Sequence, residues 1–122
     1  VLDKAFERIS RFHRELFTIR FGKNVVNLLC RDIVYLESNK RKVIVHTVRG
    51  EYEYYHKLDE AEEELLAISA DFVRIHKAYL VNMEHVEAFQ YEKLALRDGT
   101  ILSISEAHRA NVRSRFWEWG SE

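Results

Sequence analysis

Short strand-like segments, separated by turn residues at regular intervals, constrain the fold of this 122-residue chain more than any other feature. Each segment is rich in β-branched and aromatic residues, which favour strands, and the Gly, Asn, Asp and Ser residues between them favour tight turns. The segments cover residues 16–21, 25–30, 33–37, 42–48, 51–55, 86–90, 93–97 and 100–104. With about eight strands and three helices in all, we predict a mainly β protein of one domain.

The first 15 residues have the spacing of an amphipathic helix instead. The positions of its inner face recur at intervals of three and four residues, at Leu2, Phe6, Ile9 and His13. Charged residues fill most of the positions between them. This helix has three interpretations, because its apolar face can pack on its own domain, form a dimer seam or belong to a linker from an upstream domain. Since the chain begins at Val1 rather than Met, we expect residues 1–15 to be a helical linker and residues 16–122 to be the folded domain.

Charge is distributed unevenly along the chain. Residues 51–71 hold one Lys and eight Asp or Glu residues, a net charge of −7, whereas the whole chain has −1 and the remainder therefore carries +6. Residues 58–68 have helical periodicity, with Leu58 and Leu65 on one face and the acids on the other. We predict a helix with a solvated acidic face here, and a basic surface elsewhere that suits an anionic partner.

The segment from Phe72 to Asn82 combines large apolar residues with cations and contains neither Gly nor Pro. Its apolar members are Phe72, Ile75, Tyr79 and Val81, and its polar members are Arg74, His76, Lys77 and Asn82. Such a mixture is typical of a half-buried strand. We therefore predict one strand, whose apolar side chains anchor the core and whose basic side chains face an anion.

The sequence lacks the motifs that mark most enzymes and metalloproteins. The four glycines form no phosphate-binding loop, the six histidines lack the close spacings of metal ligands, and no nucleophile occupies a recognisable elbow. Cys30 is the single cysteine, so no internal disulfide forms and a reducing compartment is expected. No signal peptide or membrane-length apolar run occurs. We predict a cytoplasmic protein that is not an enzyme and needs no metal or cofactor.

Basic and polar residues occur in three groups at predicted turns or element ends: Lys40, Arg41 and Lys42; Arg74, His76 and Lys77; Ser105, His108 and Arg109. Lys and Arg bind phosphates, and both also pair with guanine in the major groove of DNA. The third group lies at the start of a predicted helix, whose N-terminus adds partial positive charge. One basic turn alone does not indicate DNA binding, since many such turns only increase solubility. The three groups together are stronger evidence for it.

Three stretches of the sequence, in this order, resemble the LytTR DNA-binding domain family: residues 32–38 (DIVYLES), 72–82 (FVRIHKAYLVN) and 94–105 (LALRDGTILSIS). The resemblance extends from about Leu16 to Arg115, and the central stretch is its most specific part. It implies an elongated arrangement of small antiparallel sheets, with a short acidic helix and flanking N- and C-terminal helices. A helix-turn-helix is not part of this fold.

The resemblance also implies a function. LytTR domains are usually the C-terminal output modules of bacterial two-component response regulators, in which they follow a receiver domain. They bind paired direct repeats, commonly as dimers, through loops that enter successive major grooves. We therefore expect double-stranded promoter DNA as the partner, a homodimer on direct-repeat sites, and an upstream receiver or sensor domain.

The positions at which the family contacts DNA correspond to particular residues of this chain. The resemblance places base reading at Arg41, at Lys77 and in the segment just after Ser105. Contacts to the DNA backbone are expected from Lys40, Lys42, Tyr55, Lys57, His76, Ser105, His108 and Arg109. Structural roles are expected for Glu37, Arg74, Tyr79 and Asn82, with Glu37 and a partly buried Arg74 forming a pair.

Three positions depart from the family's usual residues. Ala78 stands where the family commonly has Ser, which removes one hydroxyl contact to phosphate. Glu106 follows Ser105 where the family often supplies an Arg, so either this carboxylate points away from DNA or the next basic residues take over the contact. Lys57 stands where a Ser or Asn often caps the acidic helix, whose start is then less well capped.

Two rival functions remain open at this point. The chain can be a protein-interaction module that has kept the fold but lost DNA reading, with Trp117 and Trp119 as contact residues. It can also be a metal-dependent enzyme built on scattered histidines. Salt-sensitive binding to DNA separates the first rival from the main prediction, and metal analysis of the purified protein tests the second.

Overall fold

The computed structural model describes residues 15–120, in which ten strands, two α-helices and two 3₁₀ turns occur. The strands are β1 (Leu16–Phe21), β2 (Asn24–Leu29), β3 (Ile33–Asn39), β4 (Lys42–Thr47), β5 (Gly50–Tyr55), β6 (Phe72–His76), β7 (Tyr79–Asn82), β8 (Val86–Phe89), β9 (Lys93–Leu96) and β10 (Ile101–Ser103). The helices are α2 (Leu58–Leu66) and α3 (Glu106–Gly120), and the 3₁₀ turns are η1 (Cys30–Asp32) and η2 (Met83–His85). The mainly β prediction is confirmed, whereas the predicted linker helix lies, apart from Glu15, outside the described residues.

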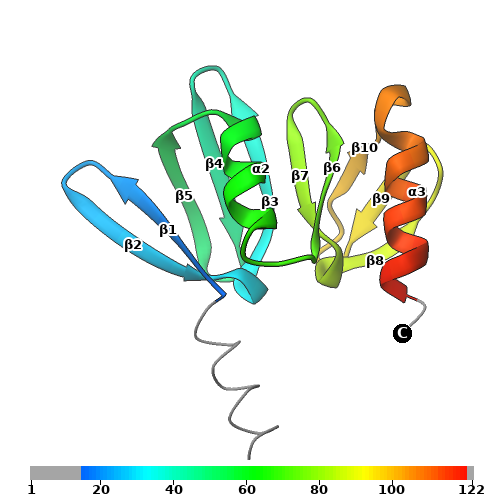
Figure 1. Cartoon of the computed structure of the whole chain (residues 1–122), viewed down its shortest axis with the longest axis horizontal. Coiled ribbons are helices and arrows are strands. Elements are labelled where there is room, and N and C mark those ends of the chain that lie inside the picture. The colour runs from blue at the N-terminus through cyan, green and yellow to red at the C-terminus, as the bar shows by residue number, and fades with distance from the viewer. Residues whose placement is uncertain (1–14, 121–122) are drawn as a thin grey trace, which may run out of the picture.

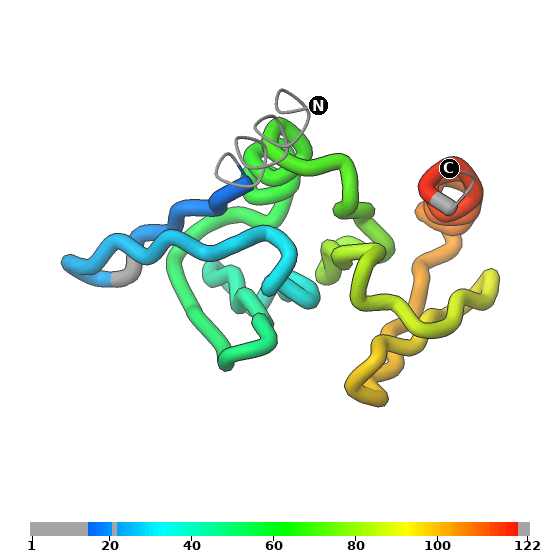
Figure 2. The backbone as a smooth tube through the Cα atoms, turned by 90° about the horizontal axis from the view of Figure 1, so that it is seen from below, coloured from blue at the N-terminus to red at the C-terminus, as the bar shows by residue number. Residues whose placement is uncertain are grey.

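The strands form three small antiparallel sheets. The largest has the order β5-β4-β3-β7-β6, β1 pairs with β2, and the last sheet has the order β10-β9-β8. Figure 1 shows α2 across one face of the largest sheet and α3 beside the last sheet. In Figure 2, the β1–β2 hairpin and α3 lie at opposite ends of the molecule, so the predicted elongated arrangement is confirmed. Across residues 15–120, none of the helices has the length and apolar character needed to span a membrane.

Helix α2 has the predicted amphipathic form. Leu58 and Leu65 are buried on its inner face, and Asp59 and Glu60 stand in its first turn, where the helix dipole stabilises carboxylates. Lys57 precedes the helix without a side-chain capping hydrogen bond. The expectation of a poorly capped helix start is therefore confirmed.

The segment from Phe72 to Asn82 is a hairpin of two strands, so the prediction of one continuous strand is wrong. β6 and β7 pair antiparallel with a register shift near Arg74, and the chain reverses at Lys77 and Ala78. Side-chain contacts rather than Gly or Asn stabilise this turn. The Ala78 N–H donates to His76 Nδ1 at 3.1 Å, and the guanidinium of Arg74 donates to the carbonyl oxygens of His76 and Lys77.

Two hydrophobic clusters form the core, and β6 and β7 separate them. The first cluster lies beneath α2 and includes Leu65 and Phe72, while the second lies beside α3 and includes Ile75 and Val112. Phe72 and Ile75 are fully buried, and Tyr79 is half-buried against the second cluster. The apolar residues of the hairpin therefore anchor the core, as predicted.

Asn82 is a buried polar residue that joins the two 3₁₀ turns. Its side chain is 1% exposed, and its Nδ2 donates to the carbonyl oxygens of Cys30 at 3.1 Å and Ile33 at 2.9 Å. Its Oδ1 accepts the Glu84 N–H at 3.0 Å. One amide thus satisfies three backbone groups, which agrees with the structural role expected for Asn82.

We predict that Asn82→Ala destabilises the fold by about 3 kcal/mol, because two carbonyl oxygens and one N–H lose a buried partner. Urea unfolding gives the free energy of unfolding of the variant and the parent chain. Asn111→Ala, at an exposed position of α3, serves as the control and should change stability by no more than about 0.5 kcal/mol. An equal loss of stability in the two variants would contradict the structural role of Asn82.

Candidate nucleic-acid interface

Three segments that lie far apart in the sequence meet along one edge of the molecule. They are the β3–β4 turn, the β6–β7 turn and the start of α3, which all lie at the upper edge in Figure 1. Two backbone hydrogen bonds hold them together: the Ser38 N–H donates to the Ala78 oxygen at 2.8 Å, and the Ser105 N–H donates to the Ile75 oxygen at 2.9 Å. The three basic groups of the sequence thus lie on what we call the loop edge.

The β3–β4 turn presents two exposed cations at the loop edge. Asn39 pairs with Lys42, which leaves Lys40 and Arg41 as the whole connection. Lys40 has φ +60°, a region that costs a non-glycine residue roughly 1 kcal/mol, so strand pairing holds the turn in this conformation. The Arg41 oxygen also accepts the His56 N–H at 3.2 Å, which ties the end of β5 to the turn.

Lys42 has a protein partner that the sequence did not reveal. Its Nζ lies 2.8 Å from Glu53 Oε1 and 5.0 Å from the centroid of the Tyr55 ring. The hydrogen bond and charge of Glu53 raise the pKa of Lys42. A phosphate therefore has to compete with Glu53 for this ammonium group, whereas the Tyr55 side chain is largely exposed, at 76%.

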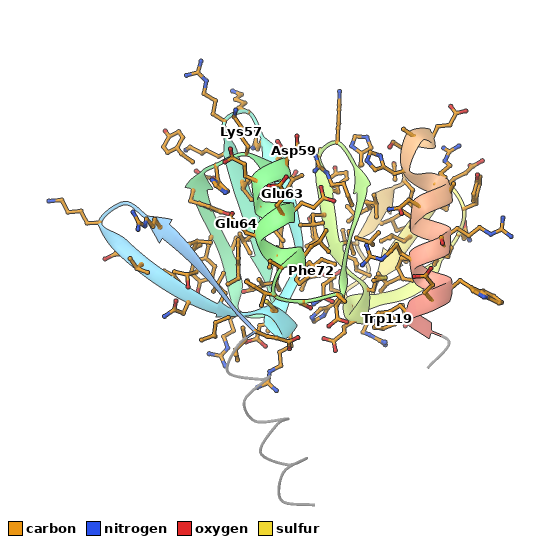
Figure 3. All side chains as sticks on the ribbon, viewed as in Figure 1. Lys57, Asp59, Glu63, Glu64, Phe72 and Trp119 are labelled. Atoms are coloured by element: carbon orange, nitrogen blue, oxygen red, sulfur yellow. The ribbon has the colours of Figure 1, made fainter. Side chains whose placement is uncertain are left out.

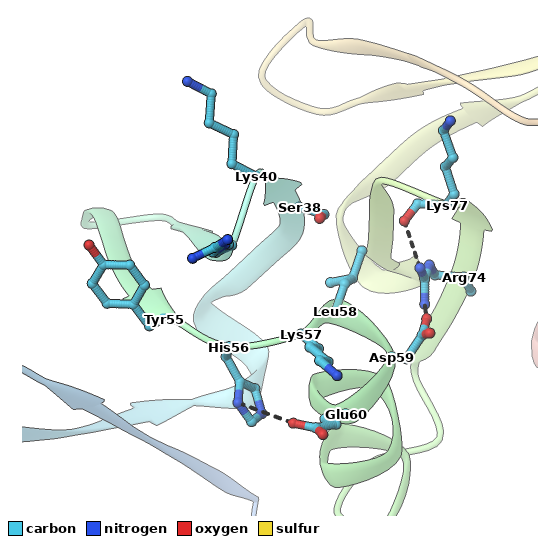
Figure 4. A pocket seen from close by; sticks show the side chains of 11 residues that line it. Ser38, Lys40, Tyr55, His56, Lys57, Leu58, Asp59, Glu60, Arg74 and Lys77 are labelled. Atoms are coloured by element: carbon cyan, nitrogen blue, oxygen red, sulfur yellow. Dashed lines mark hydrogen bonds and ion pairs between the residues drawn. The ribbon is translucent and has the colours of Figure 1, made fainter.

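The β6–β7 turn presents Lys77 and His76. Lys77 is exposed, and its side chain extends away from the ribbon on the same side as that of Lys40 (Figure 4). The pKa of His76 is lowered by burial and by the nearby Lys77, His108 and Arg74. Because Nδ1 accepts the Ala78 N–H, the neutral ring carries its proton on Nε2, which can donate to a phosphate oxygen.

Arg74 and Glu37 do not form the predicted pair, because each has other partners. Glu37 Oε1 lies 2.9 Å from His46 Nε2. Arg74 Nη1 lies 2.7 Å from Asp59 Oδ1 and 2.8 Å from Glu62 Oε1, on helix α2. The Arg74 side chain is 11% exposed, so the expected partial burial is confirmed and its guanidinium is directed into the protein.

The start of α3 is the third part of the loop edge. Ser105 directly precedes the helix, and its Oγ lies 2.6 Å from His108 Nδ1. Arg109 Nε donates to the Ile104 oxygen at 3.1 Å, and its guanidinium lies 5.9 Å from the centroid of the Tyr91 ring. Both basic residues are half-buried and held by these contacts, while Glu106 is exposed in the first turn.

An open groove of about 750 Å³ separates the β3–β4 turn from the β6–β7 turn, with the start of α2 as its floor (Figure 4). Its lining includes five cationic side chains, those of Lys40, Arg41, Lys57, Arg74 and Lys77, and two acidic ones, those of Asp59 and Glu60. Lys57 lies at the upper edge of the molecule in Figure 3. Asp59 and Glu60 lie on the helix at the floor, whereas Lys40, Arg41 and Lys77 stand in the two turns that flank the groove. These turns are therefore the part suited to phosphates.

The structure also shows the surroundings of the tryptophans and histidines on which the two rival functions rest. Trp117 is 81% exposed on α3, whereas Trp119 donates from Nε1 to Asp71 Oδ1 at 2.9 Å, at the opposite end of the molecule from the loop edge (Figure 3). Among residues 15–120, no three His, Cys, Asp or Glu side chains are grouped as metal ligands would be. His46 and His56 instead lie beside carboxylates of Glu residues.

Comparison with known proteins identifies the fold and the family. A solved LytTr DNA-binding domain of a putative methyl-accepting/DNA response regulator from Bacillus cereus superimposes with a TM-score of 0.69, at 20% identity, over 84% of this chain and 96% of that domain. The sensory transduction protein LytT of Bacillus subtilis (strain 168) is 23% identical over 112 residues, which cover 88% of this chain and 46% of LytT. The chain thus spans about half the length of this relative.

The model of the LytTr DNA-binding domain family matches residues 23–117. That range contains the β3–β4 turn, the β6–β7 turn and most of α3, and therefore the whole loop edge. The family is described by DNA binding rather than by a chemical reaction, which is consistent with the prediction that this chain is not an enzyme. From its sequence and its fold, this chain belongs to the LytTr DNA-binding domain family.

Proposed function

We propose that this chain binds double-stranded promoter DNA in a sequence-specific manner, with the turns of the loop edge in the major groove. The observation that carries the proposal is the meeting of three basic segments on one edge, fixed by backbone hydrogen bonds from Ser38 and Ser105. The major groove of B-DNA is about 12 Å wide and admits secondary-structure elements of this size. The acidic face of α2 is not part of this contact.

Arg41 and Lys77 are the proposed base-reading residues. Each stands in a hairpin turn, is exposed, and has a long side chain that can reach the edge of a guanine. The remaining predicted residues bind the DNA backbone in this proposal: Lys40, Lys42, Tyr55, Lys57, His76, Ser105, His108 and Arg109. Among these, Tyr55 and Lys57 are exposed, whereas Lys42 first has to leave Glu53.

The larger assembly is also part of the proposal. Two copies bind direct-repeat sites as a homodimer, inside the bacterial cytoplasm where promoter DNA lies. Residues 1–15 connect the domain to an upstream receiver or sensor domain. One finding supports the further domain: the Bacillus subtilis relative, which is named for sensory transduction, is about twice as long as the part that this chain matches.

Salt dependence provides the first test. If the domain neutralises about six phosphates, the slope of log K against log salt concentration should be roughly −5. Fluorescence anisotropy of a labelled duplex, selected from a random pool by the 122-residue chain, measures this slope. Salt-insensitive binding, or no binding to any selected duplex, would support the rival function of a protein-interaction module.

Arg41→Ala tests base reading. Loss of a bidentate contact to guanine should cost about 1–3 kcal/mol on the selected duplex and relax the preference at one base pair, with little effect on a random duplex. The neighbouring Lys40→Ala is the matched control: it should weaken both duplexes alike and reduce the salt slope by about 1. Equal losses of Arg41→Ala on the two duplexes would contradict its assigned role.

Glu53→Gln tests the competition for Lys42. Without the carboxylate, Lys42 is free to bind a phosphate, so the variant should bind every duplex more tightly, with a salt slope steeper by about 1. Glu63→Gln, at an exposed position of α2, makes the same change in net charge away from Lys42 and should leave the slope unchanged. The explanation fails if both variants have the slope of the parent chain.

A further inference from the structure

One guanidinium connects the acidic helix to the β6–β7 turn. Arg74 Nη1 contacts two carboxylates of α2, Asp59 at 2.7 Å and Glu62 at 2.8 Å. On its other side, Nε donates to the His76 oxygen at 2.7 Å and Nη2 donates to the Lys77 oxygen at 2.6 Å. Figure 4 shows Arg74 between Asp59 and the Lys77 carbonyl group.

These contacts determine the orientation of the turn. Both carbonyl groups point inward to the guanidinium, so they face away from the side on which the Lys77 side chain projects (Figure 4). The Ala78 carbonyl accepts the Ser38 N–H, which holds the turn against β3. Because the turn has no Gly or Asn to favour its conformation, its geometry depends on these side-chain and backbone bonds.

The carboxylates allow Arg74 to stay in this position. Its side chain is only 11% exposed, and a cation removed from water is costly unless opposite charges and hydrogen bonds compensate it. Glu62 is 28% exposed and Asp59 is 85% exposed, so the first is the more shielded partner and the second lies almost in solvent. Without both charges, we expect the guanidinium to move outward into water and to release the two carbonyl groups.

We propose that Asp59, Glu62 and Arg74 are positioning residues, which together we call the Arg74 clamp, and that they hold the β6–β7 turn in the conformation that reads DNA. The clamp acts through the turn and touches no DNA itself. This inference rests on the proposed function. It gives two acids beside the loop edge a role that is opposite to their electrostatic effect, because carboxylates near phosphates normally weaken DNA binding.

The double variant Asp59→Asn, Glu62→Gln tests the clamp, since both amides keep the shape of the side chains and remove only their charge. The clamp predicts about tenfold weaker binding to the duplex selected by the parent chain, because charge-assisted hydrogen bonds are lost. Electrostatics alone predicts the reverse, tighter binding to every duplex. Binding that is equal to or tighter than that of the parent chain overturns the proposal.

Two further variants test whether the loss of binding comes from the Arg74 contacts rather than from the change in charge of the helix. Glu60→Gln, Glu63→Gln makes the same change in charge on the same helix, outside the Arg74 contacts, and should not weaken binding to the selected duplex. Arg74→Lys keeps the charge but cannot bond two carboxylates and two carbonyl groups at once. It should therefore weaken binding to the selected duplex, and binding equal to that of the parent chain overturns the proposal.

Amide hydrogen exchange measures the clamp without DNA. In Asp59→Asn, Glu62→Gln, the amides of Ser38 and Ala78 should exchange at least several-fold faster, while the core amides of β3 and β4 keep their rates. Unchanged exchange at both amides overturns the clamp. If the parent chain binds no duplex, the proposed function fails, and this exchange result still decides whether the clamp holds the turn.

Discussion

The two hydrophobic clusters meet at β6 and β7, and the rest of the structure depends on this shared pair of strands. Side chains alternate across a strand, so Phe72 and Leu80 face the cluster beneath α2, while Val73, Ile75 and Val81 face the cluster beside α3. A slip of one residue would exchange the two sets and disrupt both clusters at once. The register of the hairpin is therefore strongly specified, and with it the position of its turn on the loop edge.

The parts that could be predicted from the sequence are those set by local patterns. Alternation and turn residues predicted most strands, and helical periodicity predicted α2, because each depends on neighbours within a few residues. The reversal at Lys77 could not be predicted in this way. Its turn is stabilised by the side chains of Arg74 and His76, which bond backbone groups two or three residues away, so no Gly, Asn or Pro marks it in the sequence. Arg74 is in turn held by two carboxylates of α2, which are distant in the sequence.

The partners of charged side chains were predicted less well than the strands, because these contacts depend on the register in which neighbouring strands pair. In the structure, Lys42 pairs with Tyr55 and Ile44 with Glu53, which makes Lys42 and Glu53 diagonal neighbours on one face of the sheet. A shift of one residue would separate them. For the same reason, the resemblance identified Arg74 as structural but did not identify its partners, which lie 15 and 12 residues away on a helix.

In the proposed complex with DNA, the effect of an acid depends on what the acid contacts. Net charge treats all 20 Asp and Glu residues alike, and at −1 it gives no reason to expect an anionic partner. Their contacts distinguish them: Glu53 neutralises Lys42 beside the β3–β4 turn, whereas Glu62 compensates Arg74, which lines the groove. In the proposed complex, the first opposes a phosphate contact and the second supports the turn that carries Lys77, so a nearly neutral chain can present an ordered basic edge.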